Sequence, residues 1–176
     1  MTQKEMQFHT FKNEPVEFSS WVKTYLKGTL EEKDIFPDNP FLDIARDNLE
    51  VGLASIKLND VESYYIQLYN TLDSLIIKYA KASHTSLIDT VVGIHQTLVA
   101  KNIDYGNSFD KAVNRFGLTG AVIRVYDKLN RLVNLEGDNG EVADEAPLDT
   151  MMDLIGYSLL TLHHYQNLDK VGDNIG

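Results

Sequence analysis

The chain contains no cysteine, so disulfide bonds and thiolate–metal sites are excluded. It also has no apolar run long enough to cross a bilayer, and its first residues lack the apolar core of a secretory signal. Basic residues are outnumbered, 16 against 26 acidic ones, and a net charge of −10 argues against binding to duplex nucleic acid. We therefore expect a soluble, cytoplasmic protein without membrane contact.

The sequence also lacks the pattern of β-strands, because no run of alternating apolar and polar residues is flanked by hairpin turns. Hydrophobic residues make up 43% of the 176 positions and recur at helical spacing. The sequence predicts an all-α, single-domain bundle of about six or seven helices. The predicted helices span approximately residues 17–30, 40–58, 60–82, 85–101, 108–116, 119–135 and 148–165.

The chain divides by motif content into three parts. Residues 1–84 carry no recognisable motif and are expected to pack, as an unassigned helical segment, on residues 85–168. Residues 169–176 read as a flexible tail. The predicted helix of residues 60–82 has a narrow apolar seam, which suits either a core helix or a dimer interface. A homo-oligomer is therefore one possible assembly.

The last predicted helix carries a stripe of carboxylates. Pro147 suits its first turn, and Glu145, Asp149 and Asp153 recur at intervals of four, so Asp149 and Asp153 share a face with Glu145 on the same side. Stacked carboxylates repel one another unless a counterion, a Lys or Arg, or a divalent metal lies against them. Oxygen ligands of this kind suit Mg²⁺ or Mn²⁺ bridging phosphates. The alternative for Glu145 and Asp149 is stabilisation by the helix dipole, which explains Asp153 poorly.

The preceding helix carries a stripe of cations. Arg124, Lys128 and Arg131 are predicted on the side opposite an apolar arc of residues 122–133, with Asp127 at the margin. Guanidinium and ammonium groups there could bind phosphate oxygens. The alternative is a solvated face on which Asp127 and Arg131 form an ordinary ion pair.

The turn at residues 101–109 is the third candidate. It contains Lys101, Asp104 and Tyr105, followed by Gly106, which permits a positive φ. Tyr105 could stack on a base, and Asp104 could bind a sugar hydroxyl or a metal, or the segment could be a routine interhelical turn. No glycine-rich phosphate loop, nucleophile elbow or zinc-protease motif is present.

These three segments, in this order, resemble a known family. The stretches KNIDYGNSF, GAVIRVYDKLNRLVNL and DEAPLDTMMDLIGYSLL are similar to the nucleotide modification associated domain of type 1, a small helical family of phages and bacteria. The resemblance covers about residues 85–166. Its pattern positions are occupied by Lys101, Asp104, Tyr105, Gly106, Arg124, Asp127, Lys128, Arg131, Asp144, Glu145, Asp149, Asp153 and Tyr157.

The resemblance implies a role in phage or bacterial nucleotide metabolism or DNA modification, in the host cytoplasm if a phage encodes the chain. The last helix of that family is also similar in style to a helix of the all-α MazG-type nucleoside triphosphate pyrophosphohydrolases, which hold Mg²⁺ with paired acids on two helices. This chain departs from that pattern, because Asp127 and Lys128 stand where paired glutamates are expected. The departure weakens the prediction of pyrophosphohydrolysis more than that of nucleotide binding.

The leading hypothesis is a nucleotide-handling protein. Glu145, Asp149, Asp153 and Asp127 would hold the metal, with Glu145 and Asp149 as catalytic residues in hydrolysis of a phosphoanhydride. Lys101, Asp104, Tyr105, Arg124, Lys128 and Arg131 would bind a nucleotide or deoxynucleotide. A second hypothesis is a non-catalytic phage protein that sequesters a nucleotide or contacts a basic host protein. In a third, the cations and carboxylates simply pair with each other.

Overall fold

The computed structural model describes residues 18–31, 54, 61–104, 108–137 and 145–168. Within these ranges every residue is helical except residues 83–86 and Gly117, and no strand is present, which confirms the all-α prediction. The described helices are α2 (Phe18–Glu31), α4 (Val61–Ala82), α5 (Leu87–Asp104), α6 (Ser108–Phe116), α7 (Leu118–Gly137) and α8 (Glu145–Leu168). The predicted helix at residues 40–58 and the predicted tail lie outside the described residues.

Local sequence signals account for several helix ends. Before α5, the Ser86 hydroxyl accepts a hydrogen bond from the Asp89 backbone N–H at 3.1 Å and donates one to the Asp89 carboxylate at 2.7 Å. Ser86 is therefore the N-cap of α5, because its hydroxyl accepts from the backbone N–H three residues later. Helix α6 ends at Gly117, whose φ of 69° few residues other than glycine adopt.

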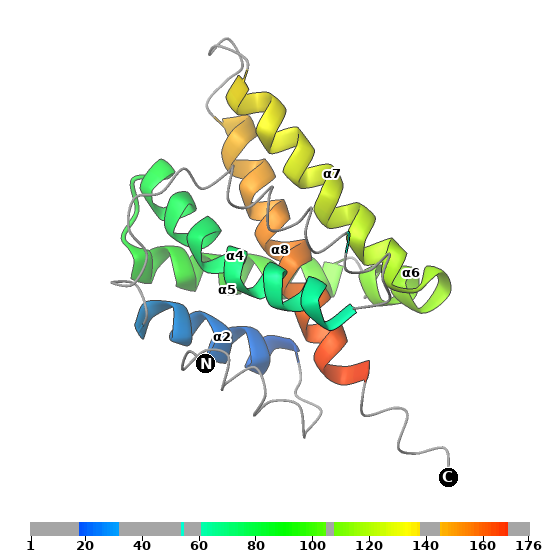
Figure 1. Cartoon of the computed structure of the whole chain (residues 1–176). Helices are drawn as coiled ribbons and strands as arrows, with labels where there is room; N and C mark the ends of the chain where they lie inside the picture. The colour runs from blue at the N-terminus through cyan, green and yellow to red at the C-terminus, as the bar shows by residue number, and fades with distance from the viewer. Residues whose placement is uncertain (1–17, 32–53, 55–60, 105–107, 138–144, 169–176) are drawn as a thin grey trace.

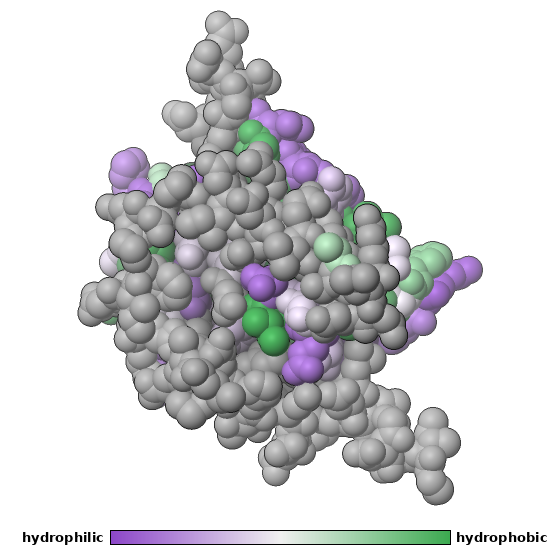
Figure 2. Space-filling model, in the orientation of Figure 1, coloured by the Kyte–Doolittle hydropathy of each residue, from purple (hydrophilic) through white to green (hydrophobic). Residues whose placement is uncertain are grey.

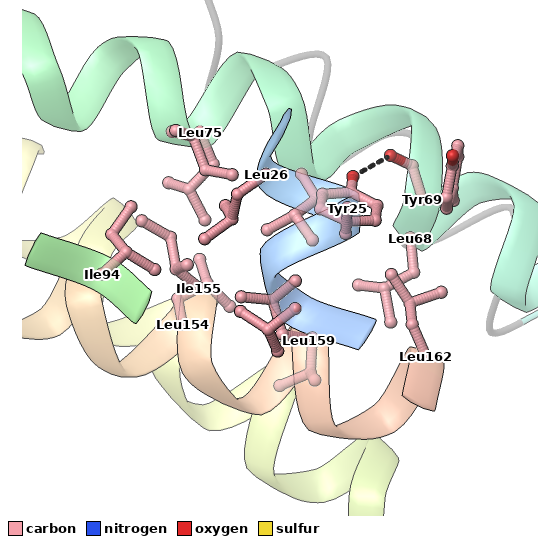
Figure 3. Close-up of a cluster of buried hydrophobic side chains, with 14 of the residues drawn as sticks. Tyr25, Leu26, Leu68, Tyr69, Leu75, Ile94, Leu154, Ile155, Leu159 and Leu162 are labelled. Carbon is pink, nitrogen blue, oxygen red and sulfur yellow. Dashed lines mark hydrogen bonds between the residues drawn. The ribbon is translucent and has the colours of Figure 1, made fainter. Parts of the chain in front are cut away.

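One hydrophobic core joins α2, α4, α5, α7 and α8 (Figure 3). Its centre is a set of fully buried aliphatic side chains, with Leu26 from α2, Leu72 from α4 and Ile155 from α8 each at most 1% exposed. Helix α4 contributes more side chains to the core than the narrow apolar seam predicted for residues 60–82, since Tyr64, Tyr69 and Ile76 are also buried. Helices from residues 1–84 and 85–168 therefore share a core, while a functional boundary at residue 84 stays a prediction.

Helices α7 and α8 lie side by side along the outer part of the bundle, and the short α6 packs against the start of α7 (Figure 1). A small second cluster of Phe109, Val113 and Ala121 joins α6 to α7, with Tyr157 of α8 packed beside it. This places the segments with the predicted cations and carboxylates on neighbouring helices. Of the helices the structure describes, none has the length and apolar character needed to span a membrane.

The buried face of α7 differs from the predicted one. Tyr126 was expected in the apolar arc but is 40% exposed, whereas Ala121 is buried at 1% exposure. Packing against α6 and α8 therefore rotates the buried face of α7 towards Ala121. Because Lys128 lies next to that side of the helix, it borders the core, whereas Arg124 and Arg131 are exposed.

Candidate functional site

Three side chains from three helices meet at Asp153. The Lys128 ammonium of α7 lies 2.7 Å from Asp153 Oδ2, and the Lys101 ammonium of α5 lies 3.1 Å from Asp153 Oδ1. Each lysine donates a hydrogen bond to its own carboxylate oxygen. We refer to Lys101, Lys128 and Asp153 as the Lys–Asp cluster. The residues are separated by 25 and 52 positions in the sequence, so only tertiary folding brings them together.

A contact between α5 and α8 lies next to the cluster. Gly156 lies three residues after Asp153 on α8, and a Cβ added there would stand 2.8 Å from Leu98 Cδ2 of α5. Leu98 in turn lies three residues before Lys101. The missing side chain at Gly156 therefore leaves room for the Leu98 side chain of α5 beside the cluster.

A second contact aligns α7 with α8. The Arg124 guanidinium lies over the Tyr157 ring, 5.8 Å from its centroid, one turn from the cluster on both helices. Tyr157 also lies near Phe109 of α6, with 6.3 Å between the ring centroids. Arg124 and Lys128, four residues apart, thus both face α8, and Arg131 continues the same row.

The two lysines determine the protonation of Asp153. Partial burial alone would raise its pKa, but the hydrogen bonds and charges of Lys128 and Lys101 outweigh that effect, and the pKa lies below its ordinary value. Asp153 is therefore ionised at neutral pH. One carboxylate faces two ammonium groups, which leaves the cluster with an excess of positive charge.

The remaining predicted cations and acids are more accessible. Arg124, Asp127, Arg131 and Asp149 are exposed, whereas the Lys128 side chain is 23% exposed and the Asp153 side chain 33%. Among the residues that the structure describes, Asp149 and Arg131 form no ion pair, and the predicted Asp127–Arg131 pair is not formed. The solvated cationic face is thus only partly present, because Lys128 faces Asp153 of α8.

Carboxylates do not converge into a metal-binding group within the described residues. No three His, Cys, Asp or Glu side chains in that part of the chain lie close enough to hold a metal ion. Asp153 offers its two oxygens to lysines, so as a metal ligand it would have to exchange a cation that is already present. The side chains of Glu145 and Asp104, and all of Tyr105, lie outside the described residues.

The sequence prediction brought together the correct helices but missed one partnership. One of its alternatives paired the cations of α7 with the acids of α8, and Lys128 does lie against Asp153. It assigned Lys101 to the turn as a ligand-binding residue, whereas the structure pairs it with Asp153. Spacing within one helix carries no information on a contact between α5 and α8, although the small residue Gly156 indicates a close approach of some helix.

Comparison of the chain with protein-family models, with curated proteins and with solved structures finds no match.

Proposed function

We propose that the protein binds the phosphate groups of a nucleotide or deoxynucleotide at the Lys–Asp cluster. One observation carries the proposal: Lys101, Lys128 and Asp153 come from three separate motif segments and meet within 3.1 Å. These segments are the ones that resemble the nucleotide modification associated domain. If the three segments build one functional site, this explains why they occur together in one chain.

The electrostatics of the cluster suit an anion. Two ammonium groups share one carboxylate, and the exposed guanidinium groups of Arg124 and Arg131 lie on the same side of α7. In this role Asp153 orients the two lysines, and their remaining N–H groups, together with Arg131, donate to phosphate oxygens. Such an excess of cations is notable in a chain with a net charge of −10.

A divalent metal and a hydrolytic step form the further part of this proposal. Mg²⁺ or Mn²⁺ would arrive with the phosphates and take Asp149 and Glu145 as ligands, with Asp127 as a further carboxylate, and would activate a water. Asp104 and Tyr105 would contact the sugar or base. Because the described residues contain no group of three metal ligands, nucleotide binding without turnover is the better-supported activity.

A purely structural role for the cluster is the competing interpretation. The same two ion pairs tie α5 and α7 to α8, and a tie of this kind requires no ligand. Arg131 separates the two interpretations, because it lies on the cationic row without an ion pair among the described residues. A structural tie makes no use of Arg131, whereas a phosphate site does.

Calorimetric titration with a panel of dNTPs and NTPs, with and without Mg²⁺ or Mn²⁺, tests the proposal, and hydrolysis is measured in parallel. Lys128→Met and Arg131→Ala should each weaken binding about tenfold or more, consistent with the loss of a charge-assisted hydrogen bond. Arg115→Ala, which removes an exposed cation of α6, is the matched control and should bind normally. Absence of binding to every nucleotide, with folded protein, would leave only the structural tie.

Asp149→Ala separates catalysis from sequestration. Loss of hydrolysis with retained binding would assign the catalytic role to Asp149. Binding without hydrolysis in the wild-type protein would instead identify a non-catalytic nucleotide-binding protein.

A further inference from the structure

The helical hairpin formed by α6 and α7 differs in charge from the rest of the molecule. Residues 108–137 contain five Lys or Arg and three Asp or Glu, which gives a net charge of +2. The whole chain has a net charge of −10, so the remaining residues carry −12. The hairpin is therefore more positive than the rest of this acidic chain, even though Lys128 is paired with Asp153 of α8, and cations of this kind attract acidic partners.

The hairpin also exposes large hydrophobic side chains. Phe116, Ile123 and Tyr126 are 65%, 52% and 40% exposed, and among the described residues only Ile88 and Val92 of α5 are comparable. In Figure 2, hydrophobic and hydrophilic side chains alternate along the edge formed by α6 and α7. Exposed apolar side chains gathered between charged ones are typical of a protein-binding surface.

These three side chains form a continuous row. Phe116 packs beside Gly120, since a Cβ added at Gly120 would lie 3.6 Å from Phe116 Cβ. Ile123 and Tyr126 follow Gly120 at intervals of three, and residues three apart form one ridge on a helix surface. We call Phe116, Ile123 and Tyr126 the α6–α7 ridge. A ridge of this kind fits the groove between side-chain rows of a second helix.

Cations stand beside this ridge. The Arg115 guanidinium lies 5.8 Å from the Phe116 ring centroid, and Lys111 precedes it by one turn on α6. Arg124 follows Ile123 in the chain, but its guanidinium lies over the Tyr157 ring of α8, so it does not belong to the ridge. Asp127 is an acid next to the row. Lys111 and Arg115 are both exposed and are the cations beside the ridge. We propose that the α6–α7 ridge is a docking surface for an acidic amphipathic helix of another protein, whose apolar side covers the ridge and whose carboxylates pair with these cations.

Two other occupants fit the surface less well. A twofold dimer through this ridge would place the same cations against each other, because such an interface uses one patch twice. A nucleic acid would prefer aromatic platforms free for stacking, whereas one face of Phe116 already has Arg115 over it and Ile123 is aliphatic. The ridge is separate from the Lys–Asp cluster, so it does not depend on the proposed nucleotide site.

A display library of helical peptides tests the proposal. All peptides carry the same leucine stripe, and each polar position is either Glu or Lys. Because the whole protein has a net charge of −10, nonspecific attraction favours Lys. We expect enrichment of Glu instead. The selected peptide should bind Ile123→Asp and Ile123→Ser at least tenfold more weakly than wild type.

Ile88→Asp is the matched control, because Ile88 is a 63% exposed hydrophobic residue on α5. It should bind the selected peptide normally, and Arg115→Glu should bind it weakly. Enrichment of Lys, failure to enrich any peptide, or equal binding to Ile123→Asp would overturn the proposal. Self-association in sedimentation, or binding of a single-stranded oligonucleotide, would also overturn it if either is lost in Ile123→Asp.

Discussion

Leu98 of α5 occupies the space into which a side chain at position 156 of α8 would project, with Cδ2 only 2.8 Å from the Cβ that Gly156 lacks. This contact lies one helical step from the Lys101–Asp153 ion pair, on the same two helices. The packing of α5 on α8 and the geometry of the candidate site are therefore linked. A change at Gly156 should affect both.

Substitution at Gly156 should lower stability in proportion to the volume added. Gly156→Val should cost about 1–3 kcal/mol in the free energy of unfolding, because it overfills a packed contact. Gly93 on α5 is the control, since a Cβ there meets nothing within 4 Å. Gly93→Ala should stabilise the protein by up to about 1 kcal/mol through helix propensity. Urea denaturation measures both, and a Gly156→Val variant as stable as Gly93→Ala would contradict the close contact at Gly156.

Asp153 should make stability depend on pH in the acid range. The folded pKa lies below the ordinary value of 3.8, so the unfolded chain takes up the proton first. The contribution of Asp153 to the free energy of unfolding is complete above pH 3.8 and is lost as the pH falls through the folded pKa. Because the side chain is 33% exposed, we expect it to contribute only up to about 1 kcal/mol.

Denaturation of Asp153→Asn across the acid range measures this contribution. The variant should unfold more easily than wild type at neutral pH, with a smaller difference in acid. Asp127→Asn is the control, because Asp127 is exposed and forms no ion pair among the described residues. If the difference in the free energy of unfolding between Asp153→Asn and wild type did not change with pH, ionisation of Asp153 would not contribute to stability.

The hydroxyl groups of Tyr64 and Tyr65 should be dispensable. Both are buried without a hydrogen-bond partner among the described residues, and burial raises the pKa of each phenol above its ordinary value. Tyr64→Phe and Tyr65→Phe should leave thermal stability unchanged or raise it by about 1 kcal/mol, since an unsatisfied polar group is removed. In Tyr65→Phe the aromatic ring should still stack on Tyr165, since the two ring centroids are 3.7 Å apart in the wild-type protein.

Thr29→Val provides the contrast to these tyrosine variants. The Thr29 hydroxyl donates to the buried Asp73 carboxylate at 2.6 Å. Its removal should destabilise the protein by about 1–3 kcal/mol, because it takes one hydrogen-bond donor away from the buried Asp73 carboxyl group. If the tyrosine variants lost as much stability as Thr29→Val, their hydroxyls would have to be hydrogen-bonded.

His164 should titrate below its ordinary pKa of 6.5. Burial disfavours the charged imidazole and lowers its pKa, although Asp110, 3.9 Å away, partly opposes this effect. The unfolded chain is then protonated first, so stability falls as the pH drops from this ordinary value towards the folded pKa. NMR titration should give a folded midpoint below that in urea, and Asp110→Asn should lower it further. A midpoint above the urea value would contradict the burial effect.

Helix locations were predictable because their signals are local. Ser86 caps α5 and Gly117 ends α6 as their residue types suggest, and helical spacing identified most of the buried positions. The prediction failed at Tyr126, whose ring continues an apolar pattern but is 40% exposed. The reason is that α7 turns the neighbouring Ala121 towards α6, and no signal within α7 reports that contact.

The candidate site was predictable only in part. Spacing indicated that Asp153 needs a positive partner and that Lys128 stands on the preceding helix, and the structure pairs them. That Lys101 also pairs with Asp153 depends on the crossing of α5 and α8. Roles for Asp149, Arg131 and the other predicted ligands stay predictions.

The sequence by itself determined the all-α class, the limits of the short α6 and the cationic and acidic rows, because each depends on residues within one or two turns. Only the tertiary structure decided which charges meet. Ion pairs between α5, α7 and α8 depend on how these helices pack, and Gly156 of α8 leaves room for the Leu98 side chain of α5 next to the pairs. The acidic row of α8, a set of like charges in the sequence, thus acquires two lysine partners at Asp153 and leaves Asp149 exposed.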